Sequence, residues 1–219
     1  MIKALVFDFD GLILETEQPI YQSFVELYAS LGCTLPLSAW VSTIGSYDGP
    51  FDPYHELERQ AGRKLDWDVL EPLRQARELE LVKQQPVLPG VEDYLNDARR
   101  LGLRIGLASS SPRDWVYGHL TRIGLLGYFE SIRTKDDVAR AKPDPALYLA
   151  VLADFGVPAQ QALALEDSLN GIRAAKGAGM WCVAVPNHLT SQLDLSEADL
   201  CLSSLAEINL EHVIHELVS

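Results

Sequence analysis

Several features that would mark other classes of protein are scarce in this sequence of 219 residues. There are three cysteines, Cys33, Cys182 and Cys201, without Cys-x-x-Cys spacing, which favours free thiols in a reducing compartment over a disulfide framework. No run of basic residues occurs, and 31 acidic residues against 18 basic ones give a formal net charge of −13. Because binding to a phosphate backbone needs clustered Lys and Arg, this balance argues against nucleic acid as a partner.

Long apolar segments are also missing. No continuous apolar segment approaches the ~18 residues that a membrane span needs. The chain opens with a strand-like run over residues 2–9, without the basic and apolar regions of a signal peptide. We therefore expect a cytoplasmic protein that binds no membrane and is a monomer or a weak homodimer.

Short apolar runs alternate with helical patterns, which is typical of a parallel sheet covered by helices on both faces. Ser111 and Asp144 each precede a proline, which predicts a helix N-cap followed by proline at the first helical position. Ser168 is predicted to begin another helix. The expected strands are residues 4–9, 103–108, 130–134, 162–165, 181–185 and 199–202.

The segment from residue 15 to residue 86 breaks this alternation. It has helical periodicity and no convincing strand, and an apolar face between Tyr21 and Leu31 ends at Gly32. The chain returns to the strand pattern after Pro89 and Gly90. We therefore predict an α/β fold with a helical insertion after the first strand.

Two pairs of acidic residues follow predicted strands. Asp8 and Asp10 stand at the end of the first strand, where two carboxylates two residues apart can converge on one point. Glu166 and Asp167 follow the strand at 162–165 and offer the hard oxygen ligands that suit Mg²⁺. Ligands of open parallel sheets bind outside the carboxyl ends of the strands. Taken singly, each pair is equally compatible with a polar turn or a helix N-cap.

A hydroxyl and a lysine complete the candidate site. Ser109 ends the strand at 103–108 and can donate to a phosphate oxygen, although serines after strands are common N-caps. Lys142 lies between Ala141 and Pro143 in a loop stiffened by proline, and its ammonium suits an anion on a neighbouring carboxylate. In isolation Lys142 is a solvated loop lysine.

The four features explain one another when they are combined. Carboxylates gathered at ~4 Å repel by about 1–4 kcal/mol per pair, depending on the effective dielectric constant, unless a divalent cation lies among them. With Mg²⁺ bound, such a site can accept a phosphate dianion, and a carboxylate can attack it to form an aspartyl-phosphate. Lys142 and Ser109 would stabilise the transferred phosphoryl group.

In order and spacing, these motifs resemble the haloacid-dehalogenase-like (HAD) phosphatase superfamily, and more closely its β-phosphoglucomutase-like branch. The resemblance extends over essentially the whole chain. It implies a Rossmann-like parallel sheet core of residues 1–14 and 87–219, with residues 15–86 inserted as an α-helical cap domain. The matching residues are Asp8, Asp10, Gly11, Ser109, Lys142, Pro143, Glu166, Asp167 and Ser168.

The resemblance also implies a role for each residue. Asp8 would be the nucleophile and a metal ligand. Asp10 would act first as general acid and then as general base, and would bind the metal through its backbone carbonyl. Ser109 and Lys142 would bind the phosphate, and the remaining Mg²⁺ ligands would be Glu166 and Asp167. The implied activity is Mg²⁺-dependent hydrolysis of a small phosphorylated metabolite, with sugar phosphates favoured.

A phosphosugar mutase of the same fold is the main alternative. Mutases of this branch carry a histidine early in the first cap helix and an arginine in the cap loop, whereas this chain has Ile20 and Asp48 near those places. Because an acid there would oppose a second phosphate, a simple phosphatase is favoured over a mutase. A non-catalytic receiver domain phosphorylated on aspartate is a third hypothesis, and the insertion at 15–86 counts against it.

Residues that contact the substrate are expected in the cap loop at 44–54, where Tyr47 and Asp48 are the candidates, although such a loop can equally fill the core of the cap. Arg74 is expected on a solvated helix face. The tryptophans are predicted to be packing residues: Trp40, Trp67, Trp115 and Trp181.

Overall fold

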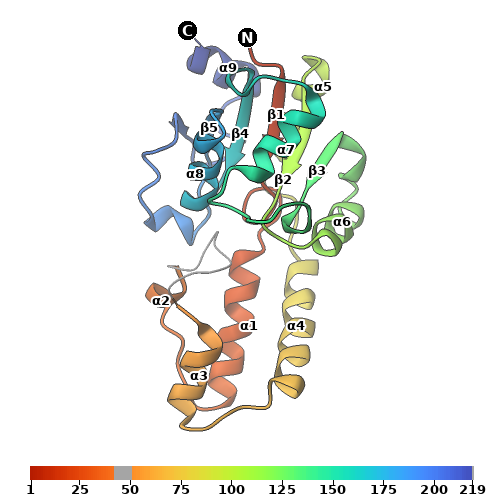
Figure 1. Ribbon diagram of the computed structural model, residues 1–219. Coiled ribbons are helices and arrows are strands. Elements are labelled where there is room, and N and C mark those ends of the chain that lie inside the picture. The colour runs from red at the N-terminus through yellow and green to blue at the C-terminus, as the bar shows by residue number, and fades with distance from the viewer. Residues whose placement is uncertain (42–50, 219) are drawn as a thin grey trace.

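The computed structural model describes residues 1–41 and 51–218, and a six-stranded sheet in the order β3-β2-β1-β4-β5-β6 forms its centre (Figure 1). Each strand runs parallel to its neighbours. The predicted α/β class is therefore confirmed, and β4 extends one residue further than predicted, to include Glu166. The strands are β1 Ala4–Phe7, β2 Arg104–Ala108, β3 Ser131–Arg133, β4 Ala162–Glu166, β5 Trp181–Ala184 and β6 Leu200–Cys201.

Helices cover both faces of this sheet. Helices α5 (Val91–Arg100), α6 (Arg113–Arg122) and α9 (Leu210–Val218) pack on one face. Helices α7 (Ala146–Phe155) and α8 (Leu169–Gly177) pack on the other. Both chain termini lie at one end of the sheet, and the helices formed by residues 17–83 lie beyond its other end (Figure 1).

The alternation of large and small residues in the strands determines how closely each layer of helices packs. In β4, Leu163 and Leu165 belong to the apolar cluster with α5, α6 and α9, whereas Ala162 and Ala164 belong to the cluster with α7 and α8. In β2, a Cβ atom on Gly106 would lie 2.5 Å from a side chain of α7. Small side chains on this face therefore allow α7 to approach the strands directly.

Two predicted helix starts are wrong by one residue. Pro112 and Pro145 are the N-cap residues of α6 and α7 and not their first helical residues. The carboxylate of Asp144 nevertheless accepts a hydrogen bond at 3.0 Å from the N–H of Ala146, the first residue of α7. The prediction for α8 is confirmed, because Ser168 is its N-cap and its hydroxyl accepts from the N–H of Gly171, the third residue of the helix.

The inserted segment is helical in its described parts. Helices α1 (Glu17–Ser30), α2 (Leu37–Val41), α3 (Pro53–Ala61) and α4 (Trp67–Lys83) lie together beyond one end of the sheet (Figure 1). We call these four helices the cap; its boundaries as a separate domain remain a prediction. They share an apolar cluster, here called the cap cluster, whose buried members are Phe24, Tyr28, Leu35, Trp40, Leu57 and Leu189.

The two connections between the sheet and the cap run side by side. Leu14 forms one isolated bridge with Asp10 and another with Val87, and the N–H of Gly11 donates to the Leu14 carbonyl oxygen at 2.8 Å. The cap therefore begins and ends next to the carboxyl end of β1. Within the ranges described, no helix combines the length and the apolar character that a membrane span requires.

Candidate active site

Asp8 and Glu166 are neighbours because β1 and β4 pair at the centre of the sheet. Phe7 lies opposite Leu165 in this parallel pair, and the N–H of Asp8 donates to the Leu165 carbonyl oxygen at 3.0 Å. Since β2 lies on the other side of β1, the strand order reverses direction here. The site therefore occupies a topological switch point of the sheet.

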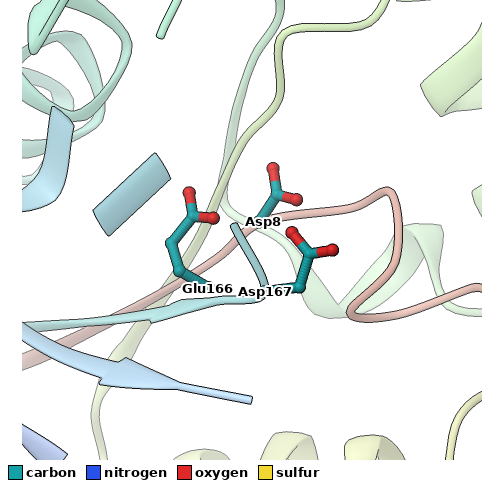
Figure 2. A group of neighbouring side chains, drawn as sticks. All are labelled: Asp8, Glu166 and Asp167. Carbon is teal, nitrogen blue, oxygen red and sulfur yellow. The ribbon is translucent and has the colours of Figure 1, made fainter. Parts of the chain in front are cut away.

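Carboxylates of Asp8, Glu166 and Asp167 gather at this point. One oxygen of each lies within 4.8 Å of the others, and all three residues are buried. Figure 2 shows their carboxyl groups pointing to the same side of the strand ends. We refer to these three residues as the acidic group. Buried like charges at this separation require a compensating cation.

Lys142 supplies one cation to the acidic group. Its Nζ donates to Asp8 Oδ1 at 2.5 Å and to Glu166 Oε1 at 2.6 Å, and its side chain is 3% exposed. The hydroxyl of Tyr148, on α7, donates to the same Glu166 oxygen at 2.5 Å. The loop around Lys142 thus places its ammonium between Asp8 and Glu166.

The other oxygen of Glu166 fits a second cation. Among the described residues, Glu166 Oε2 is buried and has no hydrogen-bond partner. Its neighbour Gly171 leaves room for the carboxylate, because a Cβ at this position would lie 1.8 Å from Oε2. An oxygen-only set of carboxylates is the donor set that Mg²⁺ prefers. These residues therefore fit a divalent cation.

Burial and mutual repulsion govern protonation in the site. Burial raises the pKa of Asp8 to about 8, because the carboxylates of Glu166 and Asp10 add to it and Lys142 only partly offsets it. Burial, then the charges of Asp8 and Glu166, raise the pKa of Asp167 well above its ordinary value. Burial alone would lower the pKa of Lys142, but the two carboxylates beside it raise that pKa overall. Asp8 and Asp167 therefore hold a proton more readily than ordinary aspartates when no metal compensates their charge.

Asp10 lies beside the acidic group with its carboxylate fully engaged by neutral donors. Oδ1 accepts from the hydroxyl of Thr16 at 2.8 Å and from the indole Nε1 of Trp115 at 2.9 Å. Oδ2 accepts from the hydroxyl of Ser111 at 2.6 Å and from that of Ser109 at 3.3 Å. The first connection to the cap and the start of α6 thus meet at this carboxylate.

Ser109 lies where the sequence places it, at the end of β2, and is fully buried. Its oxygen accepts the N–H of Ser111 at 3.0 Å and lies within reach of Asp10. Ser111 was assigned only as an N-cap, and its contact with Asp10 was missed. A run of serines after a strand does not reveal which hydroxyl faces the site.

Trp115 packs against the apolar cluster of α5, α6 and α9, as predicted, but its indole N–H also donates to Asp10, which the sequence does not predict. Only its position in the first turn of α6, directly after a strand end that carries a candidate site residue, could have suggested this contact. The prediction for Arg74 is wrong. This residue is 8% exposed and lies between Glu71 and Glu78 on its own helix, and not on a solvated face.

Asn187, which the sequence analysis did not single out, holds Asp167. Its Nδ2 donates to Asp167 Oδ2 at 2.8 Å, and its Oδ1 accepts from the N–H groups of Leu189 and Thr190 at 2.8 and 3.0 Å. Leu189 is 1% exposed and belongs to the cap cluster. This turn after β5 therefore contacts the acidic group on one side and the cap on the other.

Gly11 is required by the close approach of the loop after β1. Its φ of 77° lies in the left-handed region, and a Cβ here would lie 2.2 Å from Asp167 Oδ2. The predicted substrate residues Tyr47 and Asp48 lie outside the described residues. In the cap, burial and then the charge of the Asp10 carboxylate raise the pKa of Glu17 to about 8.

Comparisons with known proteins show the family to which this chain belongs. A family model described as haloacid dehalogenase-like hydrolase matches residues 5–185. YhcW of Bacillus subtilis, whose name proposes a phosphatase, is 49% identical over 219 residues, which are 100% of this chain and 99% of YhcW. Hexitol phosphatase B of Escherichia coli is 31% identical, and the match covers 97% of each chain.

A solved structure shares both sequence and fold. The crystal structure of CbbY from Rhodobacter sphaeroides in complex with phosphate is 31% identical and has a TM-score of 0.76, covering 94% of this chain and 96% of CbbY. The family match spans β1 to β5 and so contains every strand that borders the acidic group. The chain therefore belongs to the haloacid dehalogenase-like hydrolases and groups within them with proteins named as phosphatases.

Proposed function

We propose that this protein is a Mg²⁺-dependent phosphatase that hydrolyses a small phosphate monoester through an aspartyl-phosphate on Asp8. The observation that carries the proposal is the buried acidic group with Lys142 bonded to two of its members. This arrangement places a carboxylate nucleophile next to a fixed ammonium that can receive the phosphoryl oxygens.

Sugar phosphates are the favoured substrate class. Hexitol phosphatase B, 31% identical, bears the name of a phosphatase for sugar alcohols, and CbbY binds phosphate in its crystal structure. The cap, positioned beyond the carboxyl end of β1, would contact the alcohol part of the ester, and Tyr47 and Asp48 remain candidates for that contact. Free thiols at all three cysteines support a reducing, cytoplasmic setting.

The side chains of the site divide the chemistry into two steps. An oxygen of Asp8 attacks phosphorus, the bond from phosphorus to the ester oxygen breaks, and Asp10 gives its proton to that oxygen to release the alcohol. Asp10 then takes a proton from a water molecule that attacks phosphorus, and the bond to Asp8 breaks to release phosphate. Lys142 and Ser109 bind the phosphoryl oxygens in both steps.

Mg²⁺ would be held by Asp8, Glu166, Asp167 and the backbone carbonyl of Asp10, and would offset the negative charge that phosphate brings to an acidic site. Asn187 orients Asp167 for this task, since its amide fixes one carboxylate oxygen. Lys142 and the metal would thus together offset the negative charge of the acidic group.

The test is release of phosphate from a panel of sugar phosphates, with Mg²⁺ and with EDTA. We expect activity that chelation abolishes, and an Asp8→Asn variant that loses at least about 10³-fold, as expected for removal of a nucleophile. The matched control is Asp194→Asn, which changes an exposed aspartate whose side chain accepts from the N–H of Ser196. Activity that survives EDTA, or full activity of Asp8→Asn, contradicts the proposal.

A further inference from the structure

Trp115 contacts the carboxylate to which the proposed function gives the proton transfers. Its Nε1 donates to Asp10 Oδ1 at 2.9 Å. We propose that Trp115 is a positioning residue that fixes the orientation of the Asp10 carboxyl group for proton transfer to the leaving oxygen. The inference rests on the proposed function and adds a residue to its machinery.

The donors around Asp10 are not equivalent. Thr16, Ser109 and Ser111 offer hydroxyls, which rotate and can accept as well as donate. The indole N–H of Trp115 only donates. When Asp10 gains or loses a proton, the hydroxyls can turn to suit it, whereas the indole keeps its direction. Trp115 is therefore the fixed reference for the orientation of the carboxyl group.

The indole ring is itself held in place by aromatic packing. His119, one turn later on α6, lies edge-on to Trp115 with ring centroids 4.3 Å apart and an interplanar angle of 73°. His119 is 4% exposed and stacks on Phe9, with centroids 6.4 Å apart and an angle of 26°. Asp10 contacts Trp115, Trp115 contacts His119, and His119 contacts Phe9. Since Phe9 directly precedes Asp10, this chain of contacts returns to the loop that carries Asp10.

Arg122 connects these aromatic residues to the end of the cap. Nε of Arg122 donates to His119 Nδ1 at 3.4 Å, and its guanidinium also donates to the carbonyl oxygens of Lys83 and Val82 at 3.1 and 3.3 Å. Accepting from Arg122 requires a neutral His119 ring, and burial followed by the charge of Arg122 lowers the pKa of His119. The last turn of α4 therefore fixes α6 and, through it, the indole.

A positioning role for the acid has a specific kinetic signature. A sugar phosphate has a strongly basic leaving oxygen and needs a proton as the ester bond breaks, whereas nitrophenolate leaves without one. The ratio kcat/KM reports steps up to the release of the alcohol and excludes the later hydrolysis of the aspartyl-phosphate. Loss of Trp115 Nε1 should therefore affect the sugar phosphate selectively.

The experiment compares kcat/KM of wild-type protein and Trp115→Phe for p-nitrophenyl phosphate and for the sugar phosphate that is hydrolysed fastest in the panel. We expect about a 10-fold loss for the sugar phosphate and less than about 2-fold for the aryl ester, a fraction of what complete loss of a general acid costs. The matched control is Trp181→Phe, since Trp181 Nε1 donates to the carbonyl oxygen of Gln160 and makes no contact with Asp10. That variant should leave both values unchanged.

A second variant covers the case in which Trp115→Phe does not fold. Trp115→His keeps a five-membered ring with an N–H at the corresponding place, and it should retain the wild-type ratio between the two esters. In Trp115→Phe, equal losses on both esters, or no loss on either, would overturn the role of Trp115; in Trp115→His, a loss confined to the sugar phosphate would do so. Wild-type protein that hydrolyses neither ester would instead overturn the proposed function, and the inference with it.

Discussion

Lys142 in the sheet core and Arg74 in the cap are both buried cations that lie between two carboxylates, and they differ in the origin of those carboxylates. The partners of Lys142 are Asp8 and Glu166, which are 134 and 24 residues away along the chain. They meet only because the sheet brings the ends of β1 and β4 together. Both also belong to the acidic group, so Lys142 shares them with any bound cation.

Arg74 finds its partners within its own helix. Glu71 and Glu78 are three and four residues away on α4, and the guanidinium also donates to Ser23 and lies over the ring of Phe24 at 4.2 Å. These contacts join α4 to α1. A buried charge with local partners therefore stabilises the architecture, whereas one whose partners converge from distant strands indicates chemistry.

The largest predicted effect is that of replacing Lys142, whose carboxylate partners are distant along the chain. Lys142→Met should lower kcat/KM for phosphate release by about 10³-fold, because the transferred phosphoryl group loses a fixed cationic donor. The measurement is steady-state hydrolysis at saturating Mg²⁺, with circular dichroism to verify the fold. A variant that keeps more than about a tenth of the wild-type value would break the comparison.

For Arg74, whose partners lie on its own helix, we expect the opposite outcome, with a loss of stability and little loss of activity. Arg74→Met should lower the free energy of unfolding by about 2 kcal/mol, less than for a fully buried pair because Glu71 and Glu78 are 21% and 14% exposed. Its kcat/KM should change far less than that of Lys142→Met. Urea unfolding measures the first quantity. An unchanged urea midpoint combined with a large loss of activity would place Arg74 in the site instead.

A smaller effect is expected at the residue that orients a candidate metal ligand. Asn187→Ser keeps an oxygen for the N–H groups of the turn but loses the amide that donates to Asp167. The Mg²⁺ concentration for half-maximal activity should rise about 10-fold, with little change at saturation. Asn209→Ser, which changes a side chain that caps α9, is the matched control. Equal shifts in both variants would contradict a specific role for Asn187.

The smallest prediction concerns pH. Burial raises the folded pKa of Asp8 from 3.8 to about 8, so the folded metal-free protein keeps a proton that the unfolded chain has lost. The resulting stability is complete below the unfolded pKa and is lost as pH rises through the folded one. Between pH 7 and pH 8 in EDTA, this carboxyl should contribute about 1 kcal/mol less stability.

Since Mg²⁺ binds ionised carboxylates, the increase in melting temperature on adding it should be greater at pH 8 than at pH 7. Thermal unfolding with EDTA and with Mg²⁺ at the two pH values measures both effects. An increase from Mg²⁺ that is independent of pH would show that Asp8 is already ionised in the metal-free protein.

The sequence predicts the residues that strand ends bring together. Asp8, Glu166 and Asp167 follow short apolar runs, and strands that run parallel end at the same edge of a sheet, so no angle between elements is needed to place them. Predicting Lys142 required more information, because a lysine in a loop is not part of a periodic sequence pattern. Its assignment depended on the motif order and on the need for a cation among the acids.

The residues that sequence reasoning missed depend on how elements are oriented. Trp115 reaches Asp10 only because α6 leaves the sheet at a particular angle, and Asn187 reaches Asp167 only because the chain turns back after β5. Tyr148 has the period of the buried stripe of α7, and nothing in that pattern indicates that its hydroxyl bonds to Glu166. Packing angles of this kind are set by tertiary contacts, which periodicity does not encode.

The turn at Asn187–Thr190 bears on attempts to recombine this enzyme with its relatives. Leu189 belongs to the packing of the cap, although it lies about a hundred residues beyond the end of α4 in the sequence. A chimera that received α1 to α4 from another enzyme would keep Leu189, which packs against the replaced helices and not against the new ones, two residues from the amide that holds Asp167. Residue 189 should therefore be exchanged along with the four helices, as part of the same transplant.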